Sequence, residues 1–261
     1  MKAFTAMLAV AFVLAAAHTG RAEVKTEVVE YRHGDVVLEG YLAYDTAVKG
    51  KRPGILVVHE WMGHNPYVRK RAEQLAQMGY VAFALDMYGK GVRVKDATEA
   101  AALAGKYKGD RRLMRARAAA GLDVLRNRPG ADPGRLAAIG YCFGGTTVLE
   151  LARGGADLVA VVSFHGGLDT PTPEDAKNIK GKVLALHGGD DPFVPPKQVE
   201  AFQEEMRKGR VDWQFISYGG AVHSFTNPEA GNDNSQGAAY NEKADRRSWV
   251  AMKDLFAETL K

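Results

Sequence analysis

Short apolar runs recur along the chain, and longer segments with apolar residues at helical spacing separate them. Continuous apolar runs of a few residues are typical of strands that are covered on both faces, as in a parallel sheet. We therefore expect a mostly parallel central sheet. Its predicted strands are residues 54–60, 80–86, 135–141, 158–165, 182–188 and 211–218.

The segment before these runs follows another pattern, because polar and apolar residues alternate between Thr26 and Asp45 around a turn at Gly34. This alternation predicts an antiparallel hairpin at the sheet edge. Strands that alternate with helices predict an α/β fold, with helices on both faces of the sheet. In such folds ligands bind beyond the carboxyl ends of the strands. The predicted helices are residues 65–79, 110–128, 195–209 and 244–260, and another begins near Phe143.

The first residues have the pattern of a secretory signal, with one lysine, an apolar run over residues 6–17 and then small residues that suit a cleavage site. The apolar run is too short to span a bilayer. Cleavage after Ala22 fits best, and cleavage after Ala17 is the alternative. We therefore expect residues 1–22 to be a signal peptide and residues 23–261 to form one domain. That domain is expected to be exported, periplasmic or secreted, and not to be held in a membrane.

Composition and charge narrow the class of partner. The 261-residue chain carries a formal net charge of +4, and loss of Lys2 and Arg21 with the signal lowers it to +2. This charge is too small to indicate a nucleic acid or a membrane surface as partner. A content of 46% hydrophobic residues is ordinary for a globular domain with a sizeable core. We expect a monomer that binds a small-molecule substrate.

The single cysteine, Cys142, lies between glycines directly after an apolar run. Exported proteins use cysteines in pairs, so a lone cysteine indicates a reactive site or an intermolecular bond. The alternative is a buried cysteine that acts as a small hydrophobic side chain. The stretch from Gly140 to Gly144 fits the nucleophile-elbow pattern, with cysteine in the usual place of serine. A side chain at either glycine would collide with neighbouring backbone. The thiol would then project at a helix N-terminus, which favours a thiolate.

A cysteine nucleophile needs a base and an acid that orients the base. In elbow enzymes these follow in the order nucleophile, acid, histidine. Asp190 and Asp191 lie in a turn after one predicted strand, and His223 lies in a glycine-rich loop after the next. Cys142, Asp191 and His223 therefore have the expected order and the expected positions after strands.

Three other histidines, His59, His165 and His187, also close predicted strands, and each fits a hydrogen-bonded core residue or one that supports the site. The sequence contains no HExxH or CxxC motif. These two spacings are typical of common zinc sites. We therefore expect no metal and no cofactor.

Four motifs resemble those of the dienelactone hydrolase family, a branch of the α/β-hydrolases. They are HEWMGHN at residues 59–65, GYCFGG at 140–145, DDPFVP at 190–195 and HSF at 223–225. The resemblance extends from about Val36 to the C-terminal helix. It implies the α/β-hydrolase fold and an enzyme that hydrolyses carboxylic esters or lactones.

The resemblance also implies roles for single residues. Cys142 would be the nucleophile, His223 the base and Asp191 the partner of that base. The backbone N–H groups of Trp61 and Phe143 would form the oxyanion hole. Such donors stabilise the negative charge that develops in the transition state, which is usually the largest catalytic contribution.

Glu60 matches a family glutamate that contacts the resting cysteine and helps to deprotonate it when substrate arrives; a salt-bridged structural acid is the alternative. The type enzyme holds a substrate carboxylate with two arginines, where this chain has Lys90 and Asn227. Lysine lacks the bidentate fork of arginine, and asparagine carries no charge. With Tyr88, these two residues are the candidate substrate-binding residues. The departure predicts a neutral or weakly anionic ester or lactone.

Other functions stay open at this point. The same site could pass an acyl group to another alcohol, amine or thiol, which would make the protein an acyltransferase. The fold could also serve as a non-catalytic binding module, or the lone thiol as a redox sensor, although no resolving cysteine is present. Residues 89–110 are expected to form part of a lid, and the polar loop at residues 227–241 could gate access.

Overall fold

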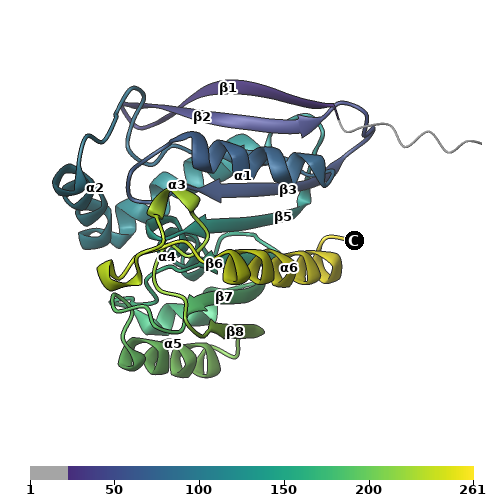
Figure 1. The fold of residues 1–261 in the computed structure, drawn as a ribbon. Helices are drawn as coiled ribbons and strands as arrows, with labels where there is room; N and C mark the ends of the chain where they lie inside the picture. The colour runs from purple at the N-terminus through teal and green to yellow at the C-terminus, as the bar shows by residue number, and fades with distance from the viewer. Residues whose placement is uncertain (1–22) are drawn as a thin grey trace, which may run out of the picture.

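One eight-stranded sheet runs through the residues that the computed structural model describes, 23–261 (Figure 1). The predicted signal peptide, residues 1–22, lies outside the described residues, so export stays a prediction. The strands are β1 (Val24–His33), β2 (Val36–Asp45), β3 (Arg52–Val58), β4 (Val81–Ala84), β5 (Ala131–Tyr141), β6 (Ala160–Phe164), β7 (Lys182–Gly188) and β8 (Trp213–Tyr218). Their order in the sheet is β1-β2-β4-β3-β5-β6-β7-β8, and the strands from β4 to β8 pair in parallel.

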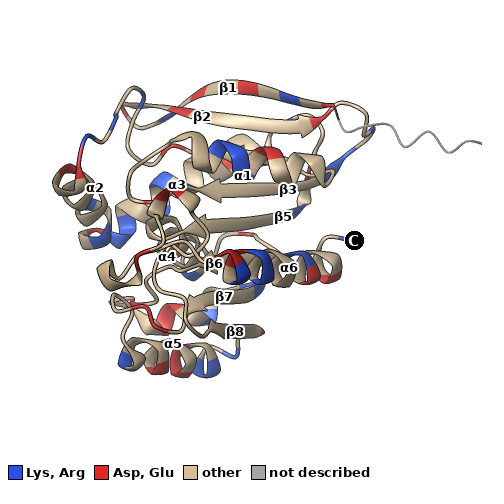
Figure 2. Cartoon of the chain, viewed as in Figure 1, with Lys and Arg blue, Asp and Glu red and all other residues tan. Residues whose placement is uncertain are grey.

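Helices lie between most of the strands. They are α1 (Pro66–Gln77), α2 (Ala97–Gly109), α3 (Arg111–Arg126), α4 (Phe143–Arg153), α5 (Pro196–Lys208) and α6 (Glu242–Thr259), with short 3-10 helices η1 (Pro173–Asn178), η2 (Pro228–Ala230) and η3 (Asn234–Gln236). Within residues 23–261 no helix is long and apolar enough to cross a membrane. Figure 2 shows basic and acidic residues interspersed along α5 and α6, in keeping with the small net charge.

The apolar residues form a core on each face of the sheet. Successive residues of β3 show this, because Ile55 and Leu56 are both fully buried but belong to clusters on opposite faces. Helices α3, α4 and α5 contribute to one cluster, and α1 and α6 to the other. Burial on both faces explains why these strands have continuous apolar runs. The predicted α/β architecture with helices on both faces is confirmed.

The N-terminal hairpin is also confirmed. Strands β1 and β2 pair antiparallel over their whole length, from Val24 opposite Asp45 to His33 opposite Val36. Gly34 occupies the turn with a φ of 59°, a conformation that glycine adopts without steric cost. β2 then pairs antiparallel with β4 and so joins the hairpin to the parallel strands.

Helix α2 was not among the predicted helices, because residues 89–110 were expected only to form part of a lid. Asp96 caps α2 by accepting a hydrogen bond from the backbone N–H of Glu99 at 2.9 Å. Ala100, Ala104 and Tyr107 are its buried residues. Figure 1 shows α2 beyond one end of the sheet, at the opposite end from the C-terminus.

A buried cluster of charges joins α4 to α5. The Arg153 guanidinium donates to both carboxylate oxygens of Glu205 at 2.7 Å, and to Glu150 at 3.1 Å. The side chains of Arg153 and Glu150 have no exposed surface, and that of Glu205 is 3% exposed. Arg115 from α3 pairs with the second oxygen of Glu150 at 2.8 Å, so every one of these buried charges has an opposite partner.

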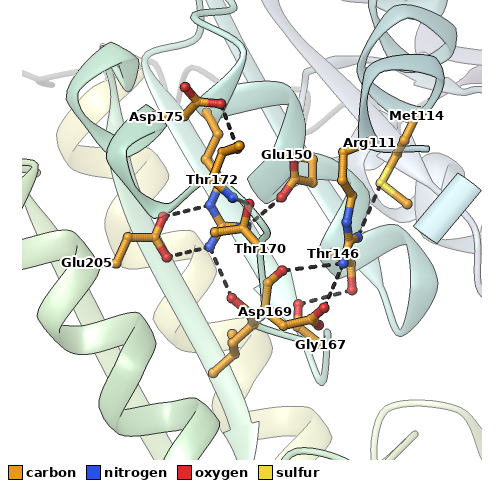
Figure 3. Close-up of polar contacts among 12 residues, drawn as sticks. Arg111, Met114, Thr146, Glu150, Gly167, Asp169, Thr170, Thr172, Asp175 and Glu205 are labelled. Atoms are coloured by element: carbon orange, nitrogen blue, oxygen red, sulfur yellow. Dashed lines mark hydrogen bonds and ion pairs between the residues drawn. The ribbon is translucent and has the colours of Figure 1, made fainter. Parts of the chain in front are cut away.

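The same region holds the loop that follows β6 (Figure 3). Arg153 donates to the carbonyl of Leu168 at 3.0 Å, and Thr146 donates to the carbonyl of Gly167 at 3.0 Å. Arg111, at the start of α3, pairs with Asp169 at 2.7 Å. Three consecutive residues of this loop are therefore fixed by side chains from α3 and α4.

Replacement of Arg153 by alanine should destabilise the protein strongly, because the buried carboxylate of Glu205 would lose its partner and that of Glu150 would lose one of two. We expect the free energy of unfolding in urea to fall by about 3–5 kcal/mol. The matched control is Arg207→Ala, which removes a solvent-exposed pair with Glu204 and should change stability by no more than about 1 kcal/mol. Equal losses in the two variants would show that the buried cluster does not stabilise the fold.

Candidate active site

Cys142 lies in the sharp turn between β5 and α4, at the carboxyl end of the central strands. Its φ of 53° and ψ of −114° place a non-glycine residue in a strained backbone conformation. A Cβ added at Gly140 would stand 2.0 Å from the carbonyl oxygen of Gly144, and one at Gly144 would stand 2.3 Å from that of Val58. The chain can therefore make this turn only with glycine at both positions, as the sequence predicts.

Asp191 and His223 meet beyond the ends of the neighbouring strands. The Nδ1 atom of His223 lies 2.8 Å from Oδ2 of Asp191, whose side chain is fully buried. The other carboxylate oxygen of Asp191 accepts a hydrogen bond from the backbone N–H of Phe193 at 2.8 Å. Asp191 is thus held in place, and it orients the imidazole of His223.

The charges around His223 favour its protonated form. Burial by itself would lower the pKa of this histidine, but the negative charge and hydrogen bond of Cys142, together with Asp191, raise it to about 10. The imidazolium of His223 is therefore favoured at neutral pH, with Asp191 on one side of the ring and Cys142 on the other.

Glu60 lies behind the site as a buried carboxyl group. Its Oε2 atom accepts a hydrogen bond from the side-chain amide of Asn227 at 2.6 Å, while Oε1 has no hydrogen-bond partner among the described residues. Burial raises the pKa of Glu60, and the amide of Asn227 and the positive charge of His223 lower it by less. The carboxyl group can therefore hold a proton more readily than an exposed glutamate.

The candidate substrate-binding residues take three different places. The Tyr88 hydroxyl donates to the carbonyl of Trp61 at 2.8 Å and so fixes the loop after β3. Asn227 contacts Glu60. Lys90 is not brought to the site, because it is half exposed and pairs with Glu30 on the hairpin. Tyr88 and Asn227 therefore contact the loop after β3, which carries Glu60 and Trp61, and Lys90 does not.

The two backbone amides predicted for the oxyanion hole are those of Trp61 and Phe143. Among the hydrogen bonds of residues 23–261, neither amide donates to a protein acceptor. Phe143 is the first residue of α4, where the N–H groups have no partner within the helix. Two donors are therefore available beside Cys142 without breaking any contact.

A cavity of about 460 Å³ opens over Cys142 and His223. Its other lining residues are Trp61, Lys108, Gly167, Phe193, Val194, Ser224, Gln236 and Ala238. Lys108 was missed in the sequence because the path of α2 was not predicted. Phe193 could have been expected near the site, because it follows the predicted acid Asp191 by two residues. Its ring packs edge-on against that of His223, with ring centroids 5.5 Å apart.

Known proteins resemble this chain over most of its length. The sequence model of the dienelactone hydrolase family matches residues 38–260. Among solved structures, m3DLH is 45% identical with a TM-score of 0.88, and the alignment covers 91% of this chain and 99% of m3DLH. P91, a dienelactone hydrolase-like promiscuous phosphotriesterase from metagenomic libraries, is 42% identical with a TM-score of 0.87 and the same coverage. Protein usf of Aquifex pyrophilus is 31% identical over 206 residues, which are 77% of this chain and 87% of that relative.

The raised pKa of His223 has a measurable consequence for Cys142. Because the imidazolium persists until the pH approaches about 10, the rate of alkylation by iodoacetamide should be high and nearly constant between about pH 7 and pH 9. In His223→Asn the rate should be lower and rise with pH, as it does for an ordinary thiol with a pKa of about 8.5. A wild-type rate that rises tenfold per pH unit over this range would contradict an imidazolium that persists beside Cys142.

Proposed function

The chain belongs to the dienelactone hydrolase family, and we propose that it cleaves carboxylic esters or lactones through a thioester acyl-enzyme on Cys142. The observation that carries this proposal is the alignment of Cys142, His223 and Asp191. The histidine contacts the acid at 2.8 Å, and its pKa is raised by the cysteine on its other side. A structural cysteine would need neither neighbour.

In the proposed first step the thiolate of Cys142 attacks the carbonyl carbon of the ester. The carbonyl oxygen becomes an oxyanion, which accepts hydrogen bonds from the free amides of Trp61 and Phe143. Collapse of this intermediate forms the thioester and breaks the bond to the alcohol. The alcohol oxygen takes its proton from the imidazolium of His223, which becomes neutral.

In the second step the neutral His223 accepts a proton from a water molecule as that water attacks the thioester. The same two amides stabilise the second oxyanion. Release of the carboxylic acid returns the electron pair to the sulfur, so that the thiolate–imidazolium pair is restored. Asp191 keeps the imidazole in one orientation through both proton transfers, because its buried carboxylate holds Nδ1.

Glu60 is proposed to assist Cys142 when the thiol is protonated. Its pKa is raised by burial, and a carboxyl group of this kind can exchange a proton with a thiol at a smaller cost than an exposed glutamate. The hydrogen bond from Asn227 keeps one oxygen engaged and leaves the other free for that exchange. A salt-bridged structural role is less suited to Glu60, because no cation pairs with it in the described chain.

The lining of the cavity supports a neutral or weakly anionic substrate. Trp61 and Phe193 present partly exposed aromatic rings, and Val194 adds apolar surface. Besides His223, Lys108 brings a positive charge to the cavity, and its exposure lets solvent screen its attraction for an anion. An acyltransferase would use the same residues, and the products formed in the presence of a competing alcohol distinguish it from a hydrolase.

A second activity to assay is phosphotriester cleavage. P91, whose described activity is that of a promiscuous phosphotriesterase, shares 42% of its residues with this chain over nearly its whole length. The thiolate proposed here would attack phosphorus in place of a carbonyl carbon and displace the aryl oxide, which takes the proton of His223. Water would then cleave the sulfur–phosphorus bond and release the phosphodiester. Turnover of an aryl phosphotriester that disappears in Cys142→Ala would extend the proposal to this class.

Cys142→Ala should abolish hydrolysis of a short chromogenic ester. Removal of the nucleophile in enzymes that form an acyl intermediate lowers kcat by several orders of magnitude, about 10⁶-fold in the most complete case. The purified variant should keep the circular dichroism spectrum and melting temperature of the wild type. A variant that hydrolyses the ester as fast as the wild type would reject the acyl-enzyme, and inactivity of both proteins would favour a non-catalytic binding module.

Lys108→Gln should raise KM for an ester that carries a carboxylate more than KM for its neutral isostere. A screened surface interaction contributes about 0.2–1 kcal/mol, so the ratio of the two KM values should change by about 2–5-fold. Lys106→Gln is the matched control, because Lys106 lies on the same helix and does not line the cavity. An identical shift in both variants would exclude a specific role for Lys108.

A further inference from the structure

We propose that His165 is a positioning residue for the reaction assigned above, on which this inference rests: its imidazole fixes the backbone of Cys142 relative to the loop that carries His223. His165 directly follows β6 and is fully buried. Its φ of 40° makes it a second strained non-glycine residue at the end of a strand, next to the strained Cys142. The sequence shows it only as a histidine at a strand end.

The first contact joins His165 to the elbow. The backbone N–H of Cys142 points to Nδ1 of His165 at 3.1 Å, and it is shared with the carbonyl of Phe164 at 3.0 Å. A backbone N–H can only donate a hydrogen bond, so Nδ1 must be the unprotonated nitrogen. The side chain thus holds the amide of the nucleophile itself.

The second contact joins His165 to the histidine loop. Its Nε2 atom lies 2.7 Å from the hydroxyl of Thr226, which follows His223 by three residues. Because Nδ1 carries no proton, the neutral ring must carry its proton on Nε2 and donate it to this hydroxyl. One imidazole therefore accepts from the nucleophile backbone and donates to the loop of the base.

Thr226 is itself fixed to α1 and α6. Its hydroxyl lies 2.6 Å from that of Tyr67, and its carbonyl accepts a hydrogen bond from Arg71 at 2.9 Å. Arg71 pairs in turn with Asp245 at 2.6 Å. The contact of His165 with Thr226 therefore connects the elbow to a buried network that cannot shift without breaking several hydrogen bonds.

The state of charge of His165 fits this role. Burial, and then the positive charge of His223, lowers the pKa of His165 well below its ordinary value. The two imidazole rings are 5.3 Å apart, so a second cation at this distance would oppose the imidazolium of His223. A neutral ring can accept the hydrogen bond from Cys142 and does not repel the positive charge on His223.

A packing role for His165 makes a different demand. Its ring contacts that of Phe225 edge-on at 5.1 Å, and any flat side chain of similar volume would preserve that packing. A positioning role requires an acceptor at the place of Nδ1. Asparagine offers its side-chain oxygen at that place, whereas glutamine offers its polar atoms at the place of Nε2.

The test compares His165→Asn with His165→Gln in ester hydrolysis by the full-length protein. We expect His165→Asn to keep kcat within about fivefold of the wild type, and His165→Gln to lower kcat by about 10–100-fold with KM changed less than about twofold. Thr226→Val removes the contact of His165 with the histidine loop but leaves the acceptor for the Cys142 amide, as His165→Asn does, so it should also keep kcat within about fivefold of the wild type. Equal activity of the two His165 variants, or a change in KM alone, would overturn the positioning role.

A measurement on the wild type keeps the proposal testable if these variants fail to fold. Two-bond ¹⁵N–¹H correlation spectra of ¹⁵N-histidine-labelled protein distinguish the two neutral tautomers. We expect His165 to be neutral with its proton on Nε2, and a proton on Nδ1 would overturn the proposal. If the wild type hydrolyses no ester, the proposed function fails, and the tautomer together with the alkylation rate of Cys142 in the two variants still tests the positioning role.

Discussion

At Cys142 the chain passes from strand to helix through one residue with a φ of 53°, and the surrounding structure has to hold it there. Such a conformation costs about 1–3 kcal/mol and persists only where the packing leaves no alternative. Gly140 and Gly144 let the backbones of β5, α4 and the end of β3 approach so closely that no Cβ atom would fit between them. The sheet that is buried on both faces supplies the rigidity, and the position of the thiol follows from it.

Two histidines close to each other differ in charge, one positive and one neutral, because their partners differ. His223 lies between Cys142 and the carboxylate of Asp191, which together favour the imidazolium. His165 lies between a backbone donor and Thr226 and has no carboxylate, so burial keeps it neutral. In the proposed reaction one ring transfers protons and the other only holds the backbone in place, although both are the same kind of side chain and their centroids are 5.3 Å apart.

Most of the sheet could be predicted from the sequence, because strands covered on both faces have continuous apolar runs. The candidate catalytic residues could be located as well, since each follows such a run. β5 begins at Ala131, earlier than predicted, since its register with β3 shifts between Pro53 and Gly54 and this depends on pairing. The ion pair of Lys90 with Glu30 and the tautomer of His165 depend on contacts between residues distant in the chain.

Helix α2 is held in place by three buried side chains and one N-terminal cap. The turn at Cys142 and the loop that carries Asp191 instead follow strands in the interior of the sheet. The buried face of α2 is nevertheless coupled to the nucleophile, because the ring of Tyr107 packs against that of Phe143, the residue after Cys142. Its exposed face carries Lys108 into the cavity and, among the described residues, makes no such contact. Substitutions on that exposed face would therefore change which molecules fit the cavity and leave the turn at Cys142 as it is.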